Sequence, residues 1–129
     1  MTRIYVVDDD ERTSRLFASL LAEDGYDVEV FRDGAEALER FANGPPPGAI
    51  ITDLVMARVS GIKVLEGARR RWPTVPVIFV TGHPELLAQE GTQFDPAPRV
   101  FSKPLIYAEF VVALRSLFEE GISLPRSQG

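Results

Sequence analysis

The sequence predicts one α/β domain in which a five-stranded parallel sheet is covered by five helices, arranged on both of its faces. Two observations carry this prediction. Short β-rich runs alternate with longer amphipathic stretches along the chain, and this alternation requires crossover connections between parallel strands. The β-rich runs are also almost continuously apolar, as expected for strands that are buried on both sides. A length of 129 residues fits a single domain with a real core, and we find no internal repeat.

Five short runs are expected to form the strands. Each is apolar or alternating in pattern, and polar residues or turn formers follow it. They cover residues 3–7, 26–30, 49–52, 77–80 and 100–101. In the second run, Val28 and Val30 alternate with Asp27 and Glu29, which is the period of a half-buried strand.

The helices are expected between and after these runs. Apolar residues recur at helical spacing around residues 16–21, 37–41, 62–68 and 110–118, and a short fourth helix is expected over residues 84–90. Gly25 is placed to end the first helix and Asp33 to cap the second. Residues 121–129 show no periodicity, so we expect a domain over residues 1–120 and a flexible tail after it.

The doubly wound, flavodoxin-like strand order 2-1-3-4-5 is the natural solution at this length. In such folds, ligands bind beyond the carboxyl ends of the strands, at the switch between strands 1 and 3. Asp8 and Asp9 follow the first strand, Asp53 the third, Thr81 the fourth and Lys103 the fifth. We therefore expect these five side chains at one edge of the sheet.

Three carboxylates at one edge repel one another unless a cation compensates their charge. The chain has no cysteine and one histidine, so the ligands are oxygens and the natural cation is Mg²⁺. Magnesium keeps coordination positions open for water or for a phosphoryl oxygen. A lysine and a threonine hydroxyl can stabilise the remaining phosphoryl oxygens, and an aspartate in the site can act as a nucleophile.

At these residues the sequence resembles the receiver domains of two-component response regulators, the chemotaxis-regulator-like superfamily. The resemblance covers Thr2 to about Glu120, and each motif alone is weak, but four motifs in this order are specific. They are Val6-Val7-Asp8-Asp9-Asp10, Thr52-Asp53-Leu54-Val55-Met56 with Gly61, Val80-Thr81-Gly82-His83, and Ser102-Lys103-Pro104.

The resemblance implies roles for the acidic residues. Asp53 would be the phosphoacceptor and would form an aspartyl phosphate. Asp9 would bind Mg²⁺ directly, together with Asp53 and the backbone carbonyl of Val55, and Asp8 would bind it largely through water. The expected function is to take a phosphoryl group from a histidine kinase or phosphotransfer protein and to change conformation.

The resemblance also implies roles for the residues after the fourth and fifth strands. Thr81 would hydrogen-bond the phosphoryl group and move with it, and the small Gly82 would let a partner approach. Lys103 would pair with a phosphoryl oxygen, and the Lys103–Pro104 peptide bond is expected to be cis. The output partner would bind the face formed by the fourth helix, fifth strand and fifth helix.

Several positions depart from the family pattern. Val100 stands where the family usually has an aromatic residue that is coupled to the threonine, so this switch position is atypical. Ala57 stands where a proline is common, and this should loosen the loop. The resemblance implies that Val55 and His83 flank the line along which water would attack the phosphoryl group. Because Val55 offers no group that orients water, we predict slow self-dephosphorylation unless His83 compensates.

Composition and motifs exclude other classes. The formal net charge of −5 argues against a nucleic-acid footprint, and no apolar run approaches the length of a membrane span. Arg69, Arg70 and Arg71 are interpreted as a solvated helix end. Neither of the two glycine-rich motifs that bind nucleotide phosphates, G-x-G-x-x-G and G-x-x-x-x-G-K-[ST], occurs in the sequence, so a nucleotide enzyme is not expected. We therefore expect a cytoplasmic protein with no direct nucleic-acid partner and no membrane partner.

Three rival functions are compatible with the same fold. A flavin binder is disfavoured because four consecutive acids follow the first strand and would repel a phosphate. An aspartate-nucleophile phosphatase usually needs a second acid where Val55 stands, so we expect no enzyme beyond self-phosphorylation and self-dephosphorylation. A phosphorylation-independent binding module of the same fold is the remaining alternative. The short tail leaves no room for an output module in this chain, which is expected to be a stand-alone regulator or a domain of a larger protein. The start at Met1 favours a stand-alone protein or an N-terminal receiver over an internal one.

Overall fold

The computed structural model describes residues 2–89 and 94–123 of the chain. Within these residues, five strands and five helices alternate strictly along the sequence. They are β1 (Arg3–Val7), α1 (Glu11–Glu23), β2 (Asp27–Phe31), α2 (Gly34–Asn43), β3 (Ala49–Thr52), α3 (Gly61–Arg71), β4 (Val77–Thr81), α4 (Glu85–Gln89), β5 (Arg99–Ser102) and α5 (Tyr107–Ser123).

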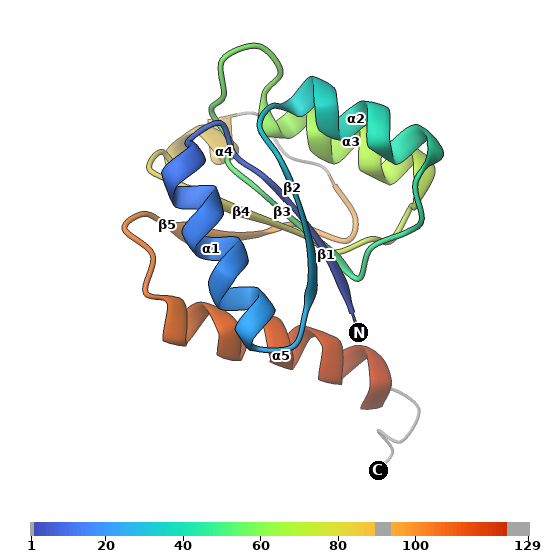
Figure 1. Ribbon diagram of the computed structural model, residues 1–129. Coiled ribbons are helices and arrows are strands. Elements are labelled where there is room, and N and C mark those ends of the chain that lie inside the picture. Colours follow the sequence, from blue (N-terminus) through green and yellow to red (C-terminus); the bar gives the residue numbers. More distant parts are fainter. Residues whose placement is uncertain (1, 90–93, 124–129) are drawn as a thin grey trace.

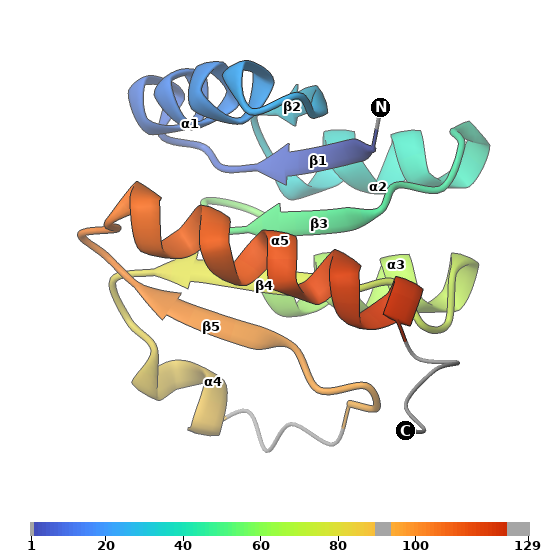
Figure 2. The ribbon, with the colours of Figure 1, turned by 90° about the horizontal axis from the view of Figure 1, so that it is seen from below.

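The strands form one parallel sheet in the order β2-β1-β3-β4-β5, which confirms the predicted topology. Figure 2 shows the strands running in the same direction, so that their carboxyl ends meet at one edge. The register pairs Val7 with Thr52 and Thr81 with Ser102. The residues that follow β1, β3, β4 and β5 are therefore brought to the same edge of the sheet.

Helices cover both faces of the sheet: α2 and α3 lie on one side, and α1 and α5 on the other (Figure 1). Alternate residues of β1 enter the two layers, as the period of a strand requires. Tyr5 and Val7 belong to the apolar cluster beneath α2 and α3, whereas Ile4 and Val6 belong to the cluster beneath α1 and α5. Each strand side chain thus has a defined helical layer to pack against.

The helices begin and end at residues whose chemistry favours those positions. Asp33 caps α2, because its carboxylate accepts a hydrogen bond from the backbone N–H of Glu36 at 2.8 Å. Gly25 follows α1 with a φ of 95°, a conformation that glycine adopts without steric cost. Both residues were expected at these boundaries from the sequence.

The ends of α5 and α4 can be compared with the expected ranges. Helix α5 continues to Ser123, three residues beyond the predicted domain boundary, and the remainder of the predicted tail, 124–129, lies outside the described residues. The ring of Phe118 packs 5.9 Å from that of Tyr26 and anchors this part of α5, so one glycine at position 121 is tolerated within the helix. Helix α4 covers Glu85–Gln89; the last residue of its predicted range, 90, lies outside the described part.

The sequence suggested that the three arginines at the end of α3 are solvated, but two of them make contacts within the protein. Arg69 donates from Nε to the carbonyl of Val75 at 2.8 Å, and Arg71 donates from Nε to the carbonyl of Phe41 at 3.2 Å. The guanidinium of Arg71 also lies 5.5 Å from the ring centre of Trp72. Two of the arginines therefore join α3 to neighbouring segments, a role that charge patterning does not reveal.

Candidate functional site

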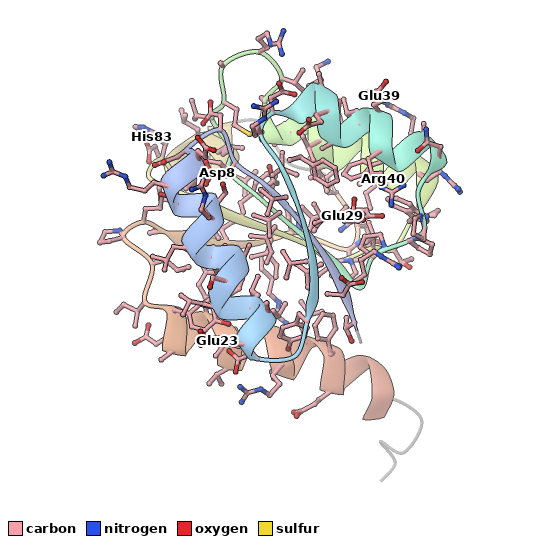
Figure 3. All side chains as sticks on the ribbon, in the orientation of Figure 1. Asp8, Glu23, Glu29, Glu39, Arg40 and His83 are labelled. Atoms are coloured by element: carbon pink, nitrogen blue, oxygen red, sulfur yellow. The ribbon has the colours of Figure 1, made fainter. Side chains whose placement is uncertain are left out.

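The predicted site residues meet at the carboxyl edge of the sheet. Asp8 follows β1, Asp53 follows β3, Thr81 ends β4 and Lys103 follows β5. Figure 3 shows Asp8 and His83 toward this end of the molecule, and the paired side chains of Glu29 and Arg40 away from it. The strand ends thus position the side chains that the topology predicted.

Lys103 joins the two carboxylates at the centre of this edge. Its ammonium donates to Oδ2 of Asp53 at 3.0 Å and to Oδ2 of Asp8 at 3.4 Å. Burial alone would lower the pKa of Lys103, but the hydrogen bond to Asp53 and the charges of both carboxylates outweigh it. The pKa of Lys103 is therefore raised, and the side chain stays charged.

Asp8 is the most buried acid of the site, with 6% of its surface exposed. Burial raises the pKa of its carboxyl group, and the nearby charge of Asp53 acts in the same direction. A hydrogen bond from the backbone N–H of Asp10 to Oδ1, at 2.9 Å, and the charge of Lys103 oppose this rise. The charge of Lys103 therefore offsets only part of the cost of burying the Asp8 carboxylate.

Asp53 is held through both of its carboxylate oxygens. Oδ1 accepts hydrogen bonds from the backbone N–H groups of Leu54 at 2.6 Å and Val55 at 3.4 Å, while Oδ2 faces Lys103. The first residue of α3, Gly61, packs so closely behind it that a Cβ there would collide with the Asp53 carbonyl oxygen. The position of Asp53 is therefore fixed by the start of α3 as well as by the end of β3.

Asp9 is exposed and points to a different partner. Its Oδ2 accepts a hydrogen bond from the backbone N–H of Ala57, at 3.1 Å, in the loop between β3 and α3. Among residues 2–89 and 94–123, no three Asp, Glu, His or Cys side chains are grouped so that they could hold a metal ion. The three carboxylates thus follow strands that end at one edge, as expected; Lys103 contacts Asp8 and Asp53, and the Ala57 N–H contacts Asp9.

The last residue of β4 and the loop after it carry three further predicted residues. Thr81 is fully buried, and its hydroxyl oxygen accepts a hydrogen bond from the backbone N–H of His83 at 3.0 Å. The exposed imidazole of His83 lies with Nδ1 3.6 Å from a carboxylate oxygen of Glu85. A Cβ added at Gly82 would meet nothing within 4 Å. Space beside Gly82 is therefore free, whereas the Thr81 side chain is shielded from solvent.

The remaining predicted positions lie around this centre. The side chain of Val55 is exposed beside Asp53, and Val100 is exposed on β5. The peptide bond between Lys103 and Pro104 is cis, and the backbone N–H of Lys103 donates to the carbonyl of Thr81 at 2.8 Å. These contacts join the end of β5 directly to the end of β4.

Sequence reasoning missed two features of the site. Arg58 of the β3–α3 loop donates to a carboxylate oxygen of Asp33 at 2.9 Å, and no local pattern signals this contact between distant segments. A cavity of about 270 Å³ also lies beside Asp8, Asp53 and Lys103, and its apolar wall comes from strands β1, β3 and β4, from α1 and from the segment that leads into α5. Both features depend on how helices pack on the sheet.

Comparison with known proteins identifies the family. The family model of the response regulator receiver domain matches residues 4–115, which is most of the chain. The chain therefore belongs to the response regulator receiver domain family, and it is a receiver domain of the two-component type. Among its described residues, the structure contains no helix long and apolar enough to cross a membrane.

Solved structures support this assignment. A response regulator receiver protein from Sinorhizobium medicae superimposes with a TM-score of 0.81 at 27% identity, over 92% of this chain and 94% of that one. TrrA from Thermotoga maritima, solved in complex with Mg(2+)-BeF, gives a TM-score of 0.76 at 26% identity over 91% and 99%. A CheY-like receiver domain protein from Methanospirillum hungatei shares the fold at 24% identity, with a TM-score of 0.84 over 93% and 95%.

Curated relatives are longer than this chain. Response regulator MprA of a Mycobacterium species (strain KMS) is 30% identical over 115 residues, which are 89% of this chain and 50% of that protein. Transcriptional regulatory protein TrcR of Mycobacterium tuberculosis is 28% identical over 124 residues, 96% of this chain and 48% of that protein. The chain thus spans about half the length of these relatives.

Proposed function

We propose that this receiver domain accepts a phosphoryl group on Asp53 from a phosphohistidine of a histidine kinase or phosphotransfer protein. The observation that carries the proposal is the contact of the Lys103 ammonium with the carboxylates of Asp53 and Asp8 at the carboxyl edge of the sheet. This arrangement joins a nucleophilic carboxylate to a cation that can stabilise the oxygens of a transferred phosphoryl group.

In the proposed transfer, a carboxylate oxygen of Asp53 attacks phosphorus and forms a P–O bond. The P–N bond of the phosphohistidine breaks, and its electron pair stays on the imidazole nitrogen. The backbone N–H groups of Leu54 and Val55 orient the carboxylate before the attack. Lys103 starts on Oδ2 of Asp53 and, after transfer, donates to a phosphoryl oxygen.

The donor set fits magnesium. Every candidate ligand is an oxygen, and the buried carboxylate of Asp8 has a raised pKa that a nearby cation would lower. Asp8, Asp9, Asp53 and the backbone carbonyl of Val55 would hold the ion; one or two protein carboxylates with water are enough for Mg²⁺. When bound, Mg²⁺ neutralises charge that builds up on the phosphoryl oxygens.

Phosphorylation then acts by shifting a two-state equilibrium. The buried hydroxyl of Thr81, which accepts from the N–H of His83, would donate its own proton to a phosphoryl oxygen, and the Lys103 ammonium would turn one of its N–H donors from a carboxylate to the phosphoryl group. An output partner would read this change on the α4–β5–α5 face, where Val100 of β5 is exposed. The domain would catalyse no reaction other than its own phosphorylation and dephosphorylation. It would act in the cytoplasm, together with its kinase.

The intact mass of the protein tests the proposal after incubation with acetyl phosphate and Mg²⁺. We expect one added phosphoryl group, which is lost in Asp53→Asn and in the presence of a chelator. Asp27→Asn is the matched control, because Asp27 is exposed at the start of β2, and it should gain phosphate as the wild type does.

The domain could accept phosphate from a protein donor and not from acetyl phosphate, so a second phosphodonor is needed. Failure with acetyl phosphate, with a phosphorylated histidine phosphotransfer protein and with beryllofluoride as a mimic would refute phosphorylation of this domain. The function would then be that of a phosphorylation-independent binding module built on the receiver fold.

A further inference from the structure

The loop between β3 and α3 is tied to Asp9 by its backbone. The hydrogen bond from the Ala57 N–H to Oδ2 of Asp9 spans 48 residues of sequence. It also gives a physical meaning to alanine at this position, because a proline has no N–H to donate. The loop that should be loose for lack of a proline thus makes a specific contact with a predicted magnesium ligand.

The same loop is clasped to the start of α2 at the next two positions. Arg58 donates from Nη2 to Oδ2 of Asp33 at 2.9 Å, and Asp33 caps α2 through its other oxygen. Hydrogen bonds from Glu36 and from Arg58 lower the pKa of Asp33 and keep it charged for this ion pair. Val59 lies against Gly34, where a Cβ would come within 2.7 Å of Val59 Cγ1 and 3.0 Å of the Val59 carbonyl oxygen. An ion pair and a close packing contact therefore hold the loop.

A lone pair of Asp9 that accepts the hydrogen bond from the loop cannot also bind a metal ion, so each interaction weakens the other. A hydrogen bond to a charged carboxylate is among the stronger ones in proteins, so it stabilises the arrangement in which Asp9 faces Ala57. While Oδ2 of Asp9 accepts the Ala57 N–H, part of the acceptor capacity of this carboxylate is used by the loop and is not available to a cation. Any contact that keeps Ala57 in place therefore competes with a cation for Asp9.

We propose that the Arg58–Asp33 ion pair is a positioning clasp that weakens magnesium binding by holding the Ala57 N–H on Asp9. The inference rests on the proposed magnesium-dependent function of the site. Neither Arg58 nor Asp33 touches the metal; both act through the loop backbone. The clasp would couple the first turn of α2 to the metal affinity of the phosphoacceptor site.

Calorimetric titration of the unphosphorylated protein with MgCl₂ measures the effect. Ala57→Pro removes the donor and should tighten magnesium binding about tenfold, the usual weight of a charge-assisted hydrogen bond. Arg58→Gln and Asp33→Asn should each tighten it by a smaller factor. Asparagine is itself a good cap, so Asp33→Asn leaves the start of α2 supported.

The two clasp variants discriminate between a clasp and simple electrostatics. Arg58→Gln removes a positive charge and Asp33→Asn removes a negative one, so a pure charge effect would move magnesium affinity in opposite directions. The clasp predicts the same direction for both, and a double variant no tighter than the stronger single one. Amide hydrogen exchange supplies a second readout, since the Ala57 N–H should exchange faster in both variants.

The outcomes separate the clasp from the function on which it rests. Tighter binding in both variants, with faster exchange at Ala57, supports the proposal. Opposite shifts, unchanged affinity or weaker binding in both would overturn it; weaker binding would mean that the N–H orients Asp9 for the metal. A wild type that binds no magnesium at this site would instead remove the magnesium-dependent function itself.

Discussion

At the scale of single residues, the site is a balance between one ammonium and two carboxylates. Lys103 contacts Asp8 and Asp53 together, and their combined negative charge keeps its pKa high in spite of burial. For Asp8 the effect of burial on the pKa is larger than the opposing effect of the Lys103 charge, so the pKa of Asp8 is raised. The resting site therefore holds an acid whose charge costs stability.

Asp8→Asn should accordingly make the domain more stable at neutral pH. Since the pKa of Asp8 is raised on folding, the native state binds the proton more tightly than the unfolded state. The free energy of unfolding then falls as pH rises from the ordinary pKa of 3.8 through the raised one. We expect a higher urea midpoint for Asp8→Asn at pH 7 without magnesium, and an advantage that shrinks as pH approaches 4.

The neighbouring Asp10 provides a control of opposite sign. Hydrogen bonds from the hydroxyl and backbone N–H of Thr13 lower the pKa of Asp10, so its charge stabilises the native state above its ordinary pKa. Asp10→Asn should therefore lower the urea midpoint at pH 7 or leave it unchanged. A lower midpoint for Asp8→Asn than for wild type would contradict the account of Asp8.

Val55 should govern how long the phosphoryl group persists. Its side chain is 48% exposed beside Asp53 and offers no hydrogen-bonding group for an attacking water. Val55→Asn supplies such a group, and we expect faster phosphate loss, followed by intact mass after removal of the donor. Val112→Asn, at an exposed valine of α5, is the matched control. Equal decay rates in Val55→Asn and wild type would count against this role.

At the scale of elements, the junction between β3 and α3 depends on a glycine. A Cβ at Gly61 would collide with the carbonyl oxygen of Asp53 and come within 2.9 Å of both Leu54 Cα and Phe79 Cε1. Backbone atoms cannot give way as a flexible side chain can, so α3 would have to move. The start of α3 and Asp53 are therefore one structural unit.

Gly61→Ala should destabilise the domain by about 1–3 kcal/mol, the usual cost of overpacking, and should slow phosphorylation as well. Gly82→Ala is the matched control, because a Cβ there meets nothing within 4 Å. We expect its free energy of unfolding within about 0.5 kcal/mol of wild type. Urea denaturation compares the two variants, and equal losses of stability would show that the Asp53–Gly61 contact has no special weight.

At the scale of the whole molecule, one sheet separates two apolar clusters. Ile50 and Ile51 are neighbours on β3, yet Ile50 belongs to the cluster under α2 and α3 and Ile51 to the cluster under α1 and α5. Both are almost completely buried. Residues adjacent in sequence thus pack in different layers.

Double-mutant cycles should detect this separation. Ile50→Val and Ile51→Val should each cost about 0.5–1.5 kcal/mol and add to within about 0.5 kcal/mol, because they share no packing partners. Ile50→Val and Val77→Ala should couple more strongly, since these residues are register partners within one cluster. Urea denaturation gives both cycles, and equal coupling in the two would contradict a core divided by the sheet.

Much of this architecture could be predicted from the sequence. The strand order follows from alternating elements, and the placement of Asp8, Asp53, Thr81 and Lys103 follows from the ends of parallel strands. These features depend on local pattern and on general rules of chain topology. The N-cap at Asp33 is likewise a local signal.

The features that escaped prediction depend on contacts between distant segments. Arg58 and Asp33 are 25 residues apart, and Asp9 and Ala57 are 48 apart, so no spacing rule joins them. The expected placement of Asp9 at the same edge as Asp8 and Asp53 did not include its hydrogen bond with the backbone of the β3–α3 loop. Helix α5 extends beyond residue 120, where a tail was expected to follow. The contact of Phe118 with Tyr26, a residue from another part of the chain, supports this end of the helix.

The central claim, that Asp53 is the phosphoacceptor, is tested most directly by locating the phosphoryl group. The protein is phosphorylated with acetyl phosphate and Mg²⁺, the acyl phosphate is reduced with borohydride, and the peptides are mapped by mass spectrometry. The account predicts reduction of the carboxyl group at position 53 alone, with nothing above background when the donor is omitted. Reduction at Asp8 or Asp9 instead of position 53 would contradict it.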